Sequence, residues 1–213
     1  MIRDLSFNIA DIVAIEPCYG PEGGNMTRIY YKDGQVSLDQ RRLETVLVNL
    51  LNLFGLELKK LRKNYSRYLN ITLYVPLPIT VELVFMPVKL RTPLAVKDGT
   101  TGYVNYLAMK GIVSAKGSEF EAAKCLIVLE GGHLMPCYTS RSNIEERIKN
   151  CRIAHEHFCS QQGLKREGSR NSDPFAFIKR IFSELVAEDV KPYEVSSREK
   201  LWSKNKQGIP EGF

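Results

Sequence analysis

Residues 30–55, YYKDGQVSLDQRRLETVLVNLLNLFG, decide the first half of the fold. Asp33-Gly34 lies between two β-prone runs and is typical of a two-residue hairpin turn, which predicts strands at 26–31 and 35–38. The apolar residues that follow recur every three or four positions, which predicts one face of a helix: Leu43, Val46, Leu47, Leu50, Leu51 and Phe54. Asp39 is a candidate start for this helix and Gly55 a candidate stop.

The same order of elements recurs later in the chain. Gly131-Gly132 predicts a turn between β-prone runs at 119–129 and 133–138, and a helix is expected from about Ser142, where the Ser142/Glu145 spacing suits a capping box. Placing Gly34 on Gly132 gives an offset of 98 residues, at which Val46 falls on Ile144 and Leu50 on Ile148. We interpret this as a degenerate tandem repeat of strand, hairpin, helix and basic loop.

The remaining runs complete the expected architecture. Strands are predicted at 12–15, 71–75, 79–85 and 103–114, and a capped helix at 173–187 precedes a tail that holds Trp202. The predicted fold class is α+β, mostly β, with two similar β-rich halves that each carry a helix, and a C-terminal helix and tail. The expected domains are 1–88, 89–171 and 172–213.

Composition favours a cytoplasmic protein with a polyanionic partner. No apolar run is long enough for a membrane span, and the start of the chain lacks a signal-peptide region. The five cysteines form no CxxC pair, so we expect reduced thiols. The net charge of +6 is concentrated in three segments, 56–70, 160–170 and 196–206. Segregated basic charge is typical of a nucleic-acid-binding surface, although solvated surface lysines remain an equal alternative.

Motifs for catalysis are absent from the sequence. It has no phosphate loop, dinucleotide-binding turn, nucleophile elbow or HExxH helix, so we expect no enzyme, no catalytic residue and no cofactor. Cys151, His155 and Cys159 are spaced four apart and could form a stripe of metal ligands on a helix. They coincide with its apolar side, so we expect buried packing and no metal.

The basic segments supply the candidate DNA-binding residues. Lysines are suited to phosphates, and arginines can bind guanine in bidentate fashion, a role for which we favour Arg62 and Arg67. Asn64 and Tyr65 can hydrogen-bond phosphates or base edges. The full candidate set is Lys59, Lys60, Arg62, Lys63, Asn64, Tyr65, Arg67, Lys165, Arg166 and Arg170.

Taken in order, these parts resemble the ComK family of competence transcription factors, as a divergent relative, over nearly the full chain. The resemblance rests on Asp33-Gly34, Phe54-Gly55, Pro78-Ile79, Val84-Phe85-Met86-Pro87, Leu90-Arg91-Thr92-Pro93, Gly102-Tyr103-Val104-Asn105, residues 128–132, Thr139-Ser140-Arg141-Ser142 and Ile181-Phe182-Ser183-Glu184-Leu185. It implies a bacterial, nucleoid-associated activator that binds A/T-rich promoter DNA as a homo-oligomer without a cofactor. Each half also resembles a LytTR DNA-binding domain, whose loops enter successive major grooves. The second half departs from that pattern, because its post-helix segment carries only Lys165, Arg166 and Arg170.

Two other functions stay open at the level of sequence. A protein-interaction module could dock through the C-terminal tail and Trp202, and its binding would be little affected by substitution of Lys59, Arg62 or Arg67. A small hydrolase could use His133 or His155, which would require a pocket of convergent polar groups around the histidine.

Overall fold

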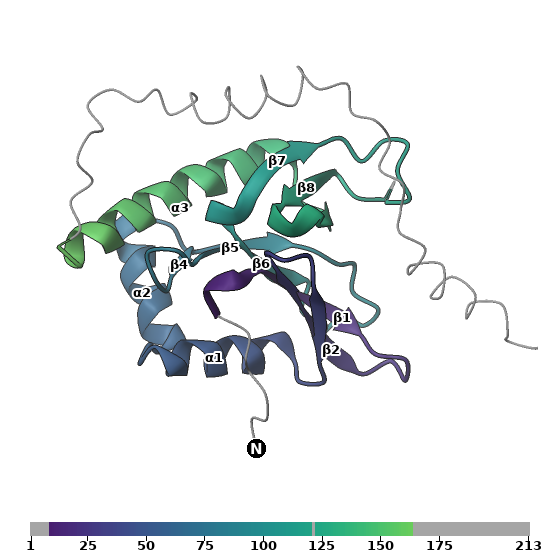
Figure 1. Ribbon diagram of the computed structural model, residues 1–213, viewed down its shortest axis with the longest axis horizontal. Coiled ribbons are helices and arrows are strands. Elements are labelled where there is room, and N and C mark those ends of the chain that lie inside the picture. The colour runs from purple at the N-terminus through teal and green to yellow at the C-terminus, as the bar shows by residue number, and fades with distance from the viewer. Residues whose placement is uncertain (1–8, 121, 164–213) are drawn as a thin grey trace, which may run out of the picture. The chain divides into compact units, whose positions relative to one another are not determined.

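The computed structural model describes residues 9–120 and 122–163, in which nine strands form two antiparallel sheets (Figure 1). The larger sheet has the order β3-β2-β1-β6-β5-β4 and the smaller one β7-β8-β9. The strands are β1 (Ile12–Tyr19), β2 (Asn25–Tyr31), β3 (Val36–Asp39), β4 (Leu77–Pro78), β5 (Val84–Lys89), β6 (Thr101–Asn105), β7 (Met109–Val113), β8 (Cys125–Leu129) and β9 (Leu134–Cys137). The helices are α1 (Leu43–Leu53), α2 (Leu58–Leu69) and α3 (Arg141–Gln161), with short 3-10 turns at Ile9–Asp11, Tyr106–Ala108 and Glu130–Gly132.

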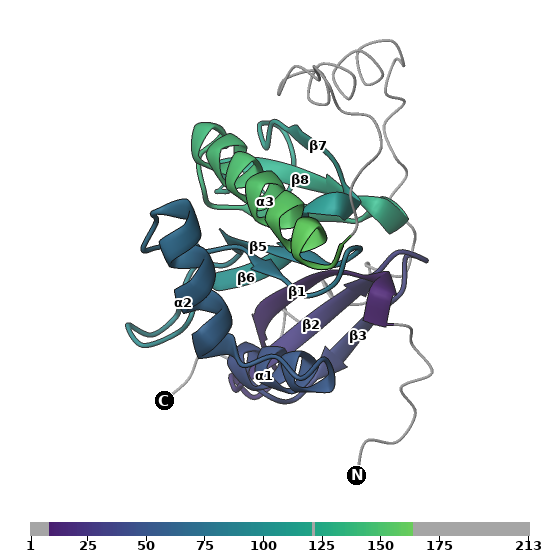
Figure 2. The same ribbon diagram turned by 90° about the vertical axis from the view of Figure 1, so that its left-hand side faces the viewer.

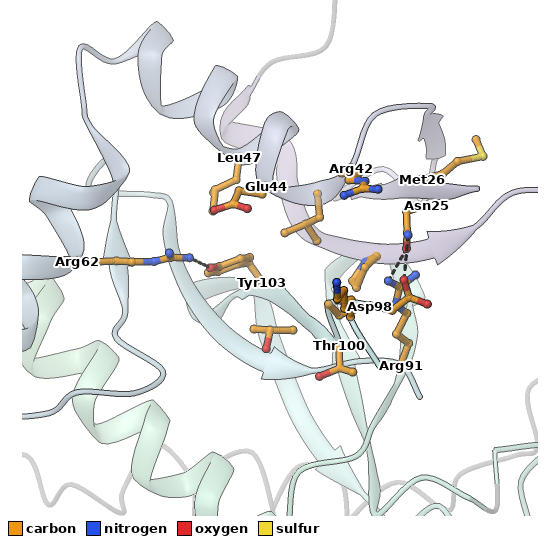
Figure 3. A pocket seen from close by; sticks show the side chains of 15 residues that line it. Asn25, Met26, Arg42, Glu44, Leu47, Arg62, Arg91, Asp98, Thr100 and Tyr103 are labelled. Atoms are coloured by element: carbon orange, nitrogen blue, oxygen red, sulfur yellow. Dashed lines mark hydrogen bonds between the residues drawn. The ribbon is translucent and has the colours of Figure 1, made fainter. Parts of the chain in front are cut away.

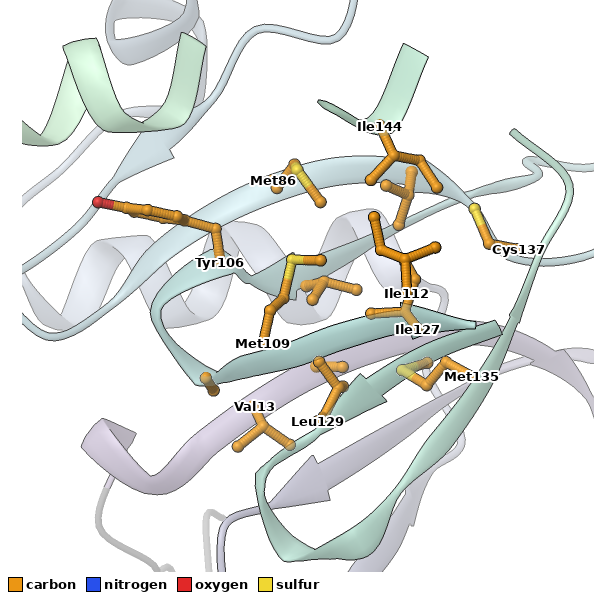
Figure 4. Packing of buried hydrophobic residues seen from close by; sticks show 14 of the residues in the cluster. Val13, Met86, Tyr106, Met109, Ile112, Ile127, Leu129, Met135, Cys137 and Ile144 are labelled. Carbon is orange, nitrogen blue, oxygen red and sulfur yellow. The ribbon is translucent and has the colours of Figure 1, made fainter. Parts of the chain in front are cut away.

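The large sheet is covered on both faces, as Figure 2 shows. One face packs against α1 and α2 through residues such as Ile15, Leu47 and Phe85. The other face packs against the small sheet and α3, and Figure 4 shows this core around Val13, Met86 and other labelled residues. The described residues are therefore layered, with the large sheet in the middle.

The burial of β5 on both faces of the large sheet explains why its sequence is apolar without alternation. Val84, Met86 and Val88 face the core shared with the small sheet, whereas Phe85 faces the core under α1 and α2. A strand that is buried on both faces needs apolar residues at every position.

The strand, hairpin and helix parts of the predicted tandem repeat are confirmed in the register of the strands. In the first hairpin Thr27 pairs with Asp39 and Tyr30 with Val36, and in the second Cys125 pairs with Cys137 and Val128 with Leu134. Every partner differs by the predicted 98 residues, and the starts of α1 and α3 differ by the same amount. Each unit also begins with a 3-10 turn, and its first strand carries a register shift near its start.

The two repeats meet at their hairpin turns. The His133 ring nitrogen Nε2 donates to the Tyr31 carbonyl over 2.8 Å, and the Tyr30 and His133 rings contact edge to face. Gly131 has φ +79°, and a Cβ on it would lie 2.7 Å from the Tyr31 oxygen. Glycine at this turn therefore satisfies both the backbone conformation and the close approach of the other repeat.

Several local predictions are wrong. Residues 71–75 form no strand, and residues 79–83 form the turn between β4 and β5, because Thr80 Oγ1 accepts from the amides of Glu82 and Leu83. The predicted strand at 103–114 is interrupted by the 3-10 turn Tyr106–Ala108, which separates the two sheets.

The predicted helix starts also need correction. The N-cap of α3 is Ser140 and no side chain caps it, so the Ser142/Glu145 capping box does not form. Asp39 ends β3 instead of starting α1, and its carboxylate binds Arg41. In both cases the side chain meets a closer local partner than the helix terminus.

The predicted fold class, α+β and mostly β with two similar halves that each carry a helix, is confirmed for the described residues. The structure also shows how the halves are joined: the boundary drawn between residues 88 and 89 falls inside β5, and β6 pairs with both β1 and β5. The helix expected at 173–187, the tail and Trp202 lie outside the described residues.

Candidate nucleic-acid interface

The first basic segment is a helix, α2, and not the loop that the sequence predicts. It contains no acidic residue and follows the break at Gly55, whose φ is +67°. It ends at Asn70, which adopts the left-handed conformation that asparagine tolerates, and Ser66 donates a side-chain hydrogen bond to the Ile71 carbonyl. The basic residues are therefore held on a rigid element.

The inner face of α2 anchors it to the protein. Leu58, Leu61 and Tyr65 recur at three- and four-residue spacing and are buried with residues of α1 and the large sheet. Burial raises the pKa of Tyr65 to about 12. We therefore remove Tyr65 from the candidate DNA-binding residues, because its side chain faces the core.

The outer face of α2 carries the remaining charge. Lys59, Lys60, Lys63, Asn64 and Arg67 are all exposed. Lys60 forms an ion pair with Glu57 at 2.8 Å on the surface, a contact that contributes little in water. Lys59, Lys63 and Arg67 form no ion pair within residues 9–120 and 122–163. This face is therefore a concentrated source of positive potential.

Arg62 lies beside this face and is directed toward the sheet. Its Nη2 donates to the Tyr103 hydroxyl over 2.6 Å, and it lines a pocket between α1, α2 and the large sheet (Figure 3). The structure therefore gives Arg62 an intramolecular partner, and Arg67 is the better placed of the two arginines for an external contact.

A ring contact between helices positions α2, and the sequence carried no signal for it. Tyr68 of α2 stacks on His157 of α3, with ring centroids 3.8 Å apart and an interplanar angle of 16°. Tyr65 contacts the same histidine edge to face at 6.0 Å. Because these residues are 89 or more positions apart in sequence, no local pattern could have paired them.

Cys151 and His155 of the stripe on α3 pack into the core as predicted, whereas Cys159 is only partly buried. His155 Nε2 donates to the Val81 carbonyl over 2.9 Å, and its Nδ1 accepts from the Tyr106 hydroxyl over 2.7 Å. Both ring nitrogens thus have partners, as does Nε2 of His133. These bonds hold the histidines in structural positions.

Lys165, Arg166 and Arg170 lie outside the described residues, so the structure places only the first of the two candidate basic segments. Within the described residues, no helix combines the length and apolar character that crossing a bilayer requires. Comparison with models of known protein families, with curated proteins and with solved structures finds no match for this chain.

Proposed function

We propose that the chain is a duplex-DNA-binding transcription regulator of the ComK type and that the outer face of α2 contacts the DNA. The observation that carries this proposal is the exposed basic face of α2, in which Lys59, Lys63 and Arg67 have no acidic partner among the described residues. A helix about 10–12 Å wide fits the major groove of B-DNA, which is about 12 Å wide.

The residues of this face are suited to different roles. Lys59, Lys60 and Lys63 would neutralise phosphates and release counterions, whereas Arg67 and Asn64 carry the donor patterns that recognise guanine and adenine edges. The anchoring of α2 through its apolar face and through Tyr68 supports this assignment, because a rigid helix keeps base-contacting side chains in register. We extend the proposal to A/T-rich promoter DNA, on which copies of the chain would assemble.

The test is a salt series of duplex binding, measured by fluorescence anisotropy with A/T-rich and random probes. The variant Lys59→Ala/Lys63→Ala removes two exposed cations from α2, and Lys116→Ala/Lys124→Ala is the matched control on the loop before β8. Losing two phosphate contacts should reduce the slope of log K against log salt by about 2, whereas the control should leave it unchanged.

Sequence recognition is tested separately by Asn64→Ala. This variant should narrow the difference in affinity between the two probes and leave the salt slope nearly unchanged, because a base contact carries preference and not counterion release. Equal slopes for the α2 variant and its control would contradict the assignment of α2, and no binding at low salt would contradict DNA binding altogether.

A further inference from the structure

A pocket of about 520 Å³ opens on the face of the large sheet that α1 and α2 cover. Its walls come from β1, β2, β6, the start of α1, Arg62 of α2 and the segment between β5 and β6. Figure 3 shows Arg62 and Tyr103 at one end and Asn25, Asp98 and Arg91 at the other. This volume is in the range of sites that hold small organic molecules.

Positive charge predominates in the lining. Arg42, Arg62, Arg91 and Lys97 are opposed by two acidic residues, Glu44 and Asp98. The Asp98 carboxylate already accepts from the Tyr19 hydroxyl, from Asn25 Nδ2 and from the Ala95 amide, and these hydrogen bonds lower its pKa to about 2. The cations therefore exceed the carboxylates, and one carboxylate is committed to the protein.

Arg91 is the buried cation at the end of the pocket that holds Asn25 and Asp98. Its side chain is buried, stacks over the Tyr19 ring at 4.2 Å, and donates from Nε to the Gly99 carbonyl and from Nη2 to Asn25 Oδ1. The third nitrogen, Nη1, is shielded from solvent and has no hydrogen-bond partner among the described residues. Arg91 forms no direct ion pair among the described residues, but its charge favours the ionised forms of the Asp98 and Glu16 carboxyls.

The start of α1 adds a second feature that favours an anion. Arg42 is the N-cap of this 11-residue helix, and no side chain caps it. The first amides of a helix have no intrahelical acceptor and lie at the positive end of its dipole. Arg42, Leu43 and Glu44 line the pocket, so this helix end and Arg91 border the same space.

The rest of the lining is apolar or aromatic. Leu47 and Tyr103 are buried, and Pro17 and Met26 extend this wall. We infer that this pocket binds a small organic phosphate, with the phosphate at the end bordered by Arg42, Arg91 and the start of α1 and the organic part against Leu47 and Tyr103.

This inference does not depend on DNA binding, although the two surfaces are connected. Arg62 belongs to α2 and also donates to Tyr103 at the far end of the pocket. A ligand that occupies this space therefore contacts the helix that we propose for DNA.

The test uses the full-length chain and isothermal titration calorimetry at low ionic strength, with adenosine monophosphate and inorganic phosphate as probes. The variant Arg42→Ala/Lys97→Ala changes two exposed side chains at the pocket, so its folding is expected to be preserved. Lys116→Ala/Lys124→Ala is the control that removes the same charge elsewhere. The pocket variant should weaken nucleotide binding by about tenfold or more, because it removes two cations that can form charge-assisted hydrogen bonds to the phosphate.

Inorganic phosphate should compete with the nucleotide and bind more weakly, because it lacks the apolar part. The inference is overturned if neither probe binds at millimolar concentration, or if the control variant weakens binding as much as the pocket variant does.

A competition with a short duplex distinguishes the two sources of phosphate. Nucleotide that stays bound in the presence of saturating duplex supports a separate small-molecule site. Duplex that displaces the nucleotide, together with an equal loss of DNA affinity in Arg42→Ala/Lys97→Ala, would assign the pocket to the DNA backbone and overturn the small-molecule inference.

Discussion

The first repeat (residues 9–53) and the second (residues 106–161) share their register and differ in how their helices continue. In the first, α1 ends after 11 residues, and Gly55 at φ +67° redirects the chain into α2. The equivalent position of the second repeat is Ile153, inside the unbroken 21-residue helix α3. One glycine thus distinguishes a repeat that presents a separate basic helix from one whose helix continues.

The difference extends to the residues beyond the break. Lys59 of α2 is exposed, whereas its equivalent, His157, packs against Tyr68 of α2. The second repeat therefore supports the helix that the first one displays. A duplicated unit can specialise in this way because the shared hairpins keep the two helices in fixed positions.

A substitution at the contact between the two repeats should have the largest effect on the free energy of unfolding. Gly131→Ala places a methyl group 2.7 Å from the Tyr31 oxygen and 2.9 Å from the Gly34 nitrogen, both backbone atoms of the first repeat. We expect the free energy of unfolding to fall by about 3 kcal/mol, from this collision and from the positive φ. Urea unfolding followed by circular dichroism measures it. Gly132→Ala has the same sign of φ and open space around it, so it should cost only about 1 kcal/mol; equal losses would show that the contact is unimportant.

An ion pair with one buried partner, Glu16, occurs in the first repeat where the second has an apolar pair. Glu16 is paired with Arg28 across β1 and β2 at 3.2 Å, and Val113 and Leu126 occupy the matching register. Arg28→Leu should lower stability by about 2 kcal/mol, less than for a fully buried pair because Arg28 is partly exposed. The double variant Glu16→Val/Arg28→Leu should recover most of this loss in the same urea measurement, and an additive loss would contradict that expectation.

The stability loss caused by Arg28→Leu should also depend on pH. Burial already raises the pKa of Glu16 against the opposing effects of Tyr30 and Arg28, and removing Arg28 should raise it further. A carboxyl whose folded-state pKa exceeds its unfolded value binds protons preferentially in the folded state, so stability falls as pH rises through that interval. The deficit of Arg28→Leu should therefore shrink as the pH is lowered from 7 toward about 4.3, the usual pKa of glutamate. A constant deficit would show that Glu16 does not cause it.

Substitutions at Gly55, where the chain breaks between α1 and α2, should have a smaller effect on stability. Gly55→Ile copies the second repeat into the first and forces a β-branched residue into the left-handed region, which costs about 1.5 kcal/mol. Gly55→Asn should cost less, since asparagine visits this region. Thermal unfolding compares the two variants, and equal melting temperatures would mean that the backbone conformation at residue 55 is not the constraint.

The smallest expected effect concerns Asp98 at the end of the pocket. Tyr19→Phe removes the first of the hydrogen bonds that lower the Asp98 pKa to about 2, so this pKa should rise toward its usual value of about 3.9. Because the folded-state pKa is depressed, the stability that Asp98 contributes is present above about pH 4 and lost as the pH falls toward 2. Titration of the side-chain carboxyl by NMR measures the shift, and an unchanged pKa would assign it to Asn25 and the Ala95 amide.

The local pattern predicted the hairpin at Asp33-Gly34, the 98-residue repeat and the apolar face of α1, except that Phe54 lies beyond the helix and is exposed. It failed at residues 71–75, which form no strand, and at 79–83, where the Thr80 hydroxyl accepts from two amides and makes the turn between β4 and β5. For the candidate site, the sequence marked the basic residues of α2 but included Tyr65, whose ring is buried. The second basic segment lies beyond the described residues.

The sequence by itself determined the two hairpins, the repeat and the concentration of charge at 56–70, since these follow from periodicity, turn residues and composition. Only the tertiary structure decided that Arg62 is bonded to Tyr103 and that Arg91 borders a pocket with its Nη1 lacking a hydrogen-bond partner among the described residues. The physical reason is that side-chain partners are chosen by packing between distant segments. His157 and Tyr68, or Arg91 and Asn25, become neighbours only when the sheets and helices assemble.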